Sequence, residues 1–99
     1  MYKENDIVTF KLVTGEEIVT RMVKDNDSTV TIYKPLTLMH SSQGMALVQT
    51  VMSVPTDQDL NIQKSSIVLS GLTREEIRNA WYESTTGLKT ASKSSILMG

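Results

Sequence analysis

The amino-acid sequence predicts a mainly β protein with one helix near its C-terminus. Residues 7–34 contain three segments in which apolar and polar residues alternate with the two-residue period of a half-buried strand. Two short polar turns separate these segments, so the three strands are expected to form an antiparallel meander. Farther along, residues 73–84 carry the start signals and the apolar spacing of an amphipathic helix.

The meander is expected to bury one face. The residues that its strands direct to that face are Val8, Phe10 and Leu12, then Ile18 and Met22, then Val30 and Ile32. Gly15 supplies the backbone freedom for the first turn, and the short polar side chains of residues 25–28 favour the second. Three short strands leave an apolar face and two edges open, so further strands or a partner must cover them.

The chain beyond the meander predicts two more strands, over residues 45–54 and 60–69. Pro35 marks an edge or a bend, because proline cannot donate to a sheet ladder. A turn at residues 41–44 precedes the fourth strand, and a loop at residues 55–59 separates it from the fifth. The apolar members of the fifth strand are Ile62, Ile67, Val68 and Leu69.

The predicted fourth strand is apolar on both faces. Leu47 and Val51 point one way, and Val48 and Met52 point the other. A strand buried on two sides in so small a protein needs either a closed barrel or a neighbouring subunit. We therefore expect this segment to require a second copy of the chain.

The predicted helix has a capping box at its start. The Thr73 hydroxyl can accept from the amide of Glu76, and the Glu76 side chain can reach back to the Thr73 amide. An apolar stripe at helical spacing includes Trp81, which is expected to cover one open end of the sheet. Gly87 suits a left-handed C-terminal cap.

Length and composition predict one small domain, residues 1–88, followed by a Ser- and Lys-rich tail, residues 89–99. The chain has no cysteine and one histidine, His40, which excludes disulfides and thiolate or His-rich metal sites. Ten Lys and Arg against eleven Asp and Glu argue against a strong bulk field for nucleic acid. No signal-peptide region or run of about 18 apolar residues occurs, so a cytoplasmic protein without membrane contact is expected.

One segment resembles a known family. Residues 13–22 are similar to the first half of the first Sm motif, in which a turn glycine, here Gly15, is followed three and seven positions later by apolar residues, here Ile18 and Met22. Residues 65–68 resemble the last strand of Hfq-type chains. Over residues 7–70 the order of strands is similar to the Sm-like fold of Sm, Lsm and bacterial Hfq proteins, and particularly to Sm-like proteins of tailed, marine phages.

This resemblance implies a strongly bent, five-stranded antiparallel sheet, or small open barrel, that assembles into a ring. In such rings the fourth strand of one subunit pairs with the fifth strand of the next. An unprotected apolar edge strand invites such pairing, and a head-to-tail contact closes into a ring when its rotation permits. The expected interface residues are Leu47, Val48, Val51, Met52, Ile62 and Ile67.

The resemblance also implies single-stranded RNA as the ligand. Sm-like pockets use the loops after the second and fourth strands, and the residues placed to contact RNA here are Lys24, Asn26 and Asn61. Neither loop contains an aromatic residue or an arginine, and the helix follows the sheet instead of preceding it. Four carboxylates would meet near the pore, either as solvated turn residues or as an acidic annulus that binds a divalent cation or repels nucleic acid: Asp25, Asp27, Asp57 and Asp59.

No catalytic constellation is present in the sequence. Ser65, Ser66 and His40 lack the elbow turn and the third orienting group that an activated nucleophile needs. No phosphate-cradling glycine loop occurs, and no cofactor or small-molecule substrate is expected. The sequence therefore favours a non-enzymatic, homo-oligomeric ring that binds RNA in the cytoplasm, of the host cell if phage-encoded. The alternative is a ring scaffold or protein-interaction factor of phage origin that does not bind RNA.

Overall fold

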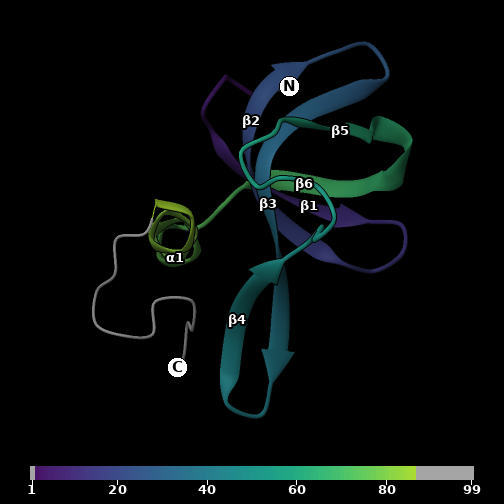
Figure 1. Ribbon diagram of the computed structural model, residues 1–99. Helices are drawn as coiled ribbons and strands as arrows, with labels where there is room; N and C mark the ends of the chain where they lie inside the picture. The colour runs from purple at the N-terminus through teal and green to yellow at the C-terminus, as the bar shows by residue number, and fades with distance from the viewer. Residues whose placement is uncertain (1, 87–99) are drawn as a thin grey trace.

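The computed structural model describes residues 2–86, which form a six-stranded antiparallel sheet and one C-terminal helix (Figure 1). The elements are β1 (Ile7–Leu12), β2 (Glu17–Asp25), β3 (Thr29–Ser41), β4 (Gly44–Gln49), β5 (Leu60–Gln63), the 3-10 turn η1 (Lys64–Ser66), β6 (Ile67–Leu72) and α1 (Glu75–Thr86). The predicted mainly β class with a C-terminal helix is confirmed. The predicted cap at Gly87 and the tail at 89–99 lie outside the described residues.

The sheet runs in the order β4-β3-β2-β1-β6, and β5 pairs with β3. The long strand β3 pairs with two further strands besides β2: its first residues pair with β5 and its last residues pair with β4. Between these halves Lys34 has a φ of 53° and is followed by Pro35, so the strand bends there. The β3–β4 hairpin consequently projects from the body of the sheet as an arm (Figure 1). The sheet of the described residues does not close into a barrel.

The structure has six strands where the sequence predicted five. The predicted strand over residues 45–54 ends at Gln49, and residues 50–59 form a loop. The predicted strand over residues 60–69 is divided by η1, because β5 pairs with β3 while β6 pairs with β1 at the opposite side of the sheet. The chain must change direction between these two partners, and it does so at η1.

The first core lies within the bend of the sheet. Its fully buried members are Val8, Phe10, Ile18, Met22, Val30 and Ile32. These are the residues that the strand period placed on one face of the meander, so that prediction is confirmed. Gly15 has a φ of 105°, in the left-handed region that the predicted turn required. Ile62 and Ile67 are half-buried and pack against this core from β5 and β6.

A second core forms where α1 packs on the opposite face of the sheet. Its buried residues are Ile7, Val19, Leu47, Ala80 and Trp81. The indole Nε1 of Trp81 donates to the carbonyl oxygen of Lys34 at 2.9 Å, so the one polar atom of this side chain is satisfied. Trp81 is a packing residue, as predicted, but it packs on a face of the sheet instead of covering an open end, and it anchors the helix at the bend of β3.

The start of α1 differs from the prediction. The helix begins at Glu75, and the Thr73 amide donates to the carbonyl oxygen of Ile7 at 3.0 Å. The Thr73 hydroxyl lies 2.9 Å from the hydroxyl of Thr9, and the Glu76 carboxylate lies near Arg74. The predicted capping box is therefore wrong, because the amide and the hydroxyl of Thr73 form hydrogen bonds with β1 instead of with Glu76.

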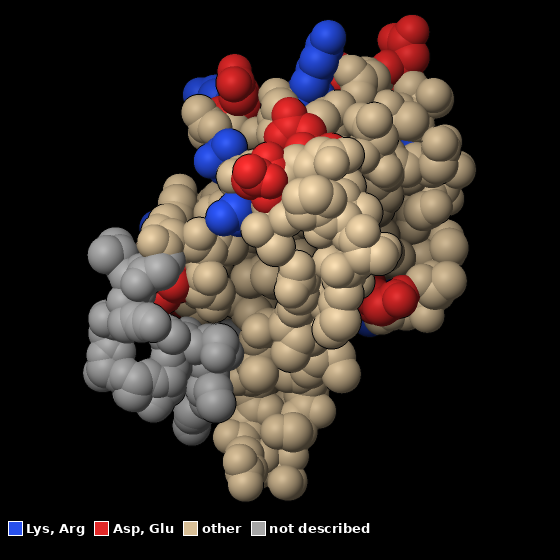
Figure 2. All heavy atoms as spheres, in the orientation of Figure 1, with Lys and Arg blue, Asp and Glu red and all other residues tan. Residues whose placement is uncertain are grey.

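Charged side chains are unevenly distributed over the molecule. In the view of Figure 2 most of them lie on the upper part and a few at mid-height, while the hairpin arm at the bottom carries none. Residues 35–56 contain no Asp, Glu, Lys or Arg. Within residues 2–86 no helix has the length and apolar character that crossing a membrane requires.

Candidate nucleic-acid interface and assembly edges

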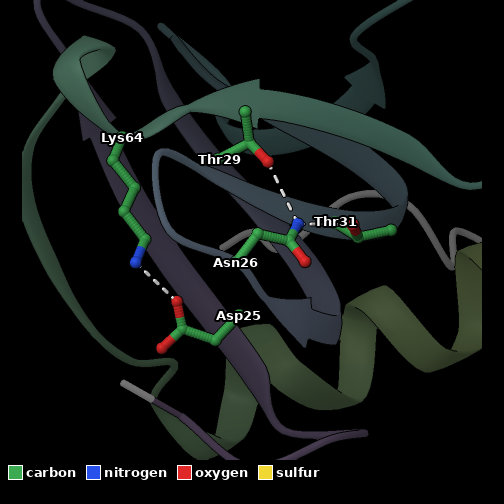
Figure 3. Close-up of polar contacts among 5 residues, drawn as sticks. All are labelled: Asp25, Asn26, Thr29, Thr31 and Lys64. Atoms are coloured by element: carbon green, nitrogen blue, oxygen red, sulfur yellow. Dashed lines mark hydrogen bonds and ion pairs between the residues drawn. The ribbon is translucent and has the colours of Figure 1, made fainter.

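Lys24, Asn26 and Asn61 gather around Thr31 in the first half of β3. Thr31 pairs with Lys24 across to β2 and with Asn61 across to β5. The Asn26 amide Nδ2 donates to the Thr31 hydroxyl at 3.0 Å and also to the Thr29 hydroxyl at 3.0 Å (Figure 3). The Thr31 hydroxyl in turn donates to the Asn61 Oδ1 at 2.7 Å. Three residues chosen from the sequence thus occupy one surface.

The hydrogen bonds divide these residues by the groups they can offer a ligand. Asn26 donates both of its amide hydrogens to threonine hydroxyls, so it stabilises the turn between β2 and β3 and has no amide hydrogen left for a ligand. Asn61 is exposed and accepts through its carbonyl oxygen, so its amide nitrogen is the group suited to a ligand. Lys24 is exposed and makes no ion pair with any described residue. Lys24 and Asn61 are therefore the available contacts.

The neighbour of the β2–β3 turn is η1, not the loop at residues 55–59. The Lys64 ammonium lies 2.6 Å from the Asp25 carboxylate (Figure 3), and the Lys64 amide donates to the Ser28 carbonyl at 2.9 Å. The register of β5 puts Gln63 beside Thr29 and Leu60 at the far end of the pairing. The sequence did not single out Lys64, because residues 60–69 were expected to form one continuous strand.

The four acidic loop residues do not gather within the chain. The turn at residues 25–28 lies at the Gln63 end of β5, and residues 55–59 lead into its Leu60 end. Over residues 2–86 no three His, Cys, Asp or Glu side chains are grouped as a metal site would need. Whether Asp25 and Asp27 meet the other two carboxylates near the pore of a ring stays a prediction about the assembly.

The ion pair to Lys64 favours the charged form of Asp25. The hydrogen bond from the Lys64 ammonium holds the pKa of Asp25 below its ordinary value of 3.8. A carboxyl group with a lowered pKa in the folded state stabilises the fold above its unfolded pKa. That contribution is lost as the pH falls through the folded pKa.

An Asp25→Asn variant is expected to unfold only a few degrees below the wild-type protein at pH 7, because the pair is solvent-exposed. The difference in Tm is expected to vanish as the pH falls through the lowered folded-state pKa of Asp25, below which the wild-type carboxyl is also uncharged. Thermal unfolding followed by circular dichroism measures both values. Asp27→Asn is the control, since Asp27 makes no ion pair with any described residue, and a pH-independent difference for Asp25→Asn contradicts the assignment.

A second cationic group lies beside Lys24 on the same face of β2 and β3. Thr31 and Tyr33 share one face of β3, and their partners across the ladder are Lys24 and Arg21. The Arg21 guanidinium carbon lies 4.4 Å from the centroid of the Tyr33 ring, a cation–π distance. The Arg21 Nε is buried without a hydrogen-bond partner among the described residues. The sequence contained a signal for this group, because Arg21 directly precedes Met22 of the buried face, and successive residues of a strand point to opposite faces.

The neighbouring cation, Lys34, forms a hydrogen bond with the helix α1. Its ammonium donates to the Thr85 carbonyl at 3.1 Å, where a positive charge is favourable at the C-terminal end of α1. It also lies 5.5 Å from the Tyr33 ring centroid. Lys24 and Arg21 are therefore the cations of this face that remain for a phosphate.

The residues predicted to form an oligomer interface are dispersed. Leu47 is 5 % exposed and is covered by α1 of its own chain. Val48 is 42 % exposed on β4, while Val51 and Met52 lie in the loop after it, where Met52 is 81 % exposed. The argument that the whole segment needs a second copy therefore fails for Leu47.

The edge strand β6 also carries exposed apolar residues, on both of its faces. Val68, Leu69 and Leu72 are 57, 66 and 67 % exposed, and β6 contains no charged residue. Among the described strands β6 pairs only with β1, so its outer edge is open. The outer edge of β5 is open in the same way, and its sequence, LNIQ, is also uncharged. Two unprotected edges thus stand on either side of η1.

No protein-family model matches this chain, and no curated protein sequence matches it.

Proposed function

We propose that the chain is an Sm-like protein that assembles head-to-tail into a homo-oligomeric ring by pairing β5 of one copy with β6 of the next. The observation that carries this proposal is the pair of open, uncharged edges. Soluble proteins ordinarily protect such edges with charges, proline or a covering segment. Here Val68, Leu69 and Leu72 are exposed instead, so a second strand is the partner that would satisfy both the ladder and the apolar side chains.

The proposed ring binds single-stranded RNA on the face formed by Lys24, Arg21 and Asn61. The cations of β2 neutralise phosphates, which supplies most of the affinity in nucleic-acid binding. The Tyr33–Arg21 pair offers a planar surface for a base, and the Asn61 amide can donate to a base edge. A ring repeats this weak site once per subunit, and simultaneous engagement raises the overall affinity.

The mass of the wild-type protein in solution tests the assembly. Sedimentation equilibrium is expected to give an integral multiple, three or more, of the 11.0 kDa chain mass, as a closed head-to-tail ring requires. A stable mass of one chain at micromolar concentration contradicts the proposal.

Lys24→Glu is expected to weaken retention of oligo(U) or oligo(A) on a filter by at least about tenfold, because it replaces a phosphate contact by a repulsion. The affinity of the wild-type protein is expected to fall as salt rises. Lys11→Glu is the matched control, since Lys11 is an exposed lysine on β1. Equal losses in both variants would mean that bulk charge, not this face, determines binding.

The second candidate function is a ring scaffold that does not bind RNA. The observation that favours it is the internal use of the Asn26 amide, together with the acidic residues Asp25 and Asp27 beside Lys24. This candidate predicts an intact ring with no oligonucleotide retention even at low salt. The two measurements above therefore separate the candidates.

A further inference from the structure

A groove of about 430 Å³ opens between the C-terminal end of α1, the base of the hairpin arm and the loop after β4. Its apolar walls are Pro35, Leu36, Leu47, Val51, Val54 and Leu60. Several of these walls remain half-exposed, since Leu36, Val51 and Val54 are covered only in part. The groove shares Leu60 with the start of β5 and is otherwise separate from the assembly edges and from the face that carries Lys24. It is a separate apolar surface that an occupant would cover.

We propose that the groove binds the C-terminal segment of the same chain, with Ile96, Leu97 and Met98 as its apolar anchor. The polypeptide leaves α1 after Thr86, and residues 83–85 form the helical wall of the groove. The segment thus begins beside the groove. Ile96–Met98 is the one run of three apolar residues in a segment otherwise rich in serine, threonine and lysine. An apolar run of this kind fits a groove of matching character.

The length of the segment permits this contact. Residues 87–95 precede the apolar run, and nine extended residues span up to about 30 Å. A short tether of this kind holds its end at an effective concentration in the millimolar range. A weak contact with a few apolar side chains is therefore populated within one chain, although it would be negligible between separate molecules at micromolar concentration.

Charge complementarity supports the same occupant. The loop that borders the groove contains Asp57 and Asp59, next to the lining residues Thr56 and Gln58. The C-terminal segment contains Lys89 and Lys93 and no acidic residue. The nearest cation, Lys34, already donates to the helix terminus. An acidic rim therefore faces a basic segment, which favours this occupant over an acidic one.

Disulfide trapping in the full chain tests the proposal directly, because the natural chain contains no cysteine. Thr56→Cys combined with Leu97→Cys is expected to lose both free thiols under mild oxidation. The product is expected to keep the mass of one chain on a non-reducing gel, at every protein concentration. Thr56 is exposed, so its replacement leaves the core intact. Met39→Cys with Leu97→Cys is the matched control, since Met39 is exposed on the hairpin arm, and it is expected to react at least about tenfold more slowly.

Each other outcome overturns the proposal. Equal rates for the two cysteine pairs would mean that the segment does not prefer the groove. A product with the mass of two chains would assign the groove to the C-terminal segment of another copy. A second measurement uses no cysteine: Leu97→Asp is expected to increase hydrogen exchange at the amides of residues 50–59 while the circular dichroism of the fold is unchanged. Unchanged exchange would contradict the contact. Both readouts are independent of ring formation and RNA binding.

Discussion

Replacing Trp81 with alanine is expected to lower the free energy of unfolding by about 3–5 kcal/mol, the range for a fully buried aromatic side chain. Trp81 is 2 % exposed and joins α1 to the second core. The variant leaves a cavity against Leu47 and Val19 and removes the donor to the Lys34 carbonyl. Domains of this size have about 5–15 kcal/mol of stability in total, so the variant is expected to be near unfolding. Urea denaturation followed by circular dichroism measures the loss.

Trp81→Phe separates packing from the hydrogen bond. Phenylalanine keeps most of the ring but cannot donate to the Lys34 carbonyl, so the expected loss is about 1–3 kcal/mol. Tyr82→Ala is the surface control, because Tyr82 is 43 % exposed on the same helix, and its expected loss is clearly smaller than that of Trp81→Ala. If Trp81→Ala were no more destabilising than Tyr82→Ala, the helix would not be anchored through the indole.

Charging the outer surface of β6 is expected to abolish the proposed ring. The double variant Leu69→Lys and Leu72→Lys adds two positive charges to an edge that is uncharged in the natural chain. Lysine on an edge strand is a common protection against strand pairing, because the ammonium would have to be desolvated at the contact. The mass in sedimentation is expected to fall to the 11.0 kDa of one chain, with the circular dichroism spectrum unchanged.

Met39→Lys is the control for this experiment. Met39 is an apolar residue that is 50 % exposed, but it lies on the hairpin arm, away from β5 and β6. Its variant is expected to keep the mass of the wild-type protein. If Met39→Lys dissociated the assembly and the β6 variant did not, the hairpin arm would be the interface and the proposed strand pairing would be wrong.

The meander and its core could be predicted because their signals are local. Strand period alone identified the face that Phe10 and Met22 occupy, and a turn glycine identified the conformation at Gly15. These features depend on residues a few positions apart. The same is true of the apolar stripe that placed Trp81 against the sheet.

The later strands were misjudged because tertiary pairing determines where they end. Residues 60–69 have an unbroken strand character, and only the choice of different partners for β5 and β6 imposes the turn at η1. The same turn brings Lys64 to Asp25, a contact that no local pattern encodes. The helix start was displaced for a similar reason, since the backbone amide of Thr73 completes a hydrogen bond to β1.

The sequence selected residues that lie together in the structure, but it did not predict their hydrogen bonds or the pair of Arg21 and Tyr33 beside them. Lys24 and Asn26 were chosen from a predicted loop and Asn61 from the start of the predicted fifth strand, and the structure places all three around Thr31. The cation–π pair of Arg21 and Tyr33 required the register of β2 against β3, which a bulge near Thr20 shifts.

The bend of β3 at Lys34 couples two parts of the molecule mechanically. The Lys34 carbonyl accepts the indole hydrogen of Trp81, and the Lys34 ammonium donates to the last turn of α1. The backbone of the same residue bends the strand. The helix and the hairpin arm therefore share a single pivot. We therefore expect a displacement of the helix to shift the hairpin arm as well, which a fluorophore at the tip of the arm would detect.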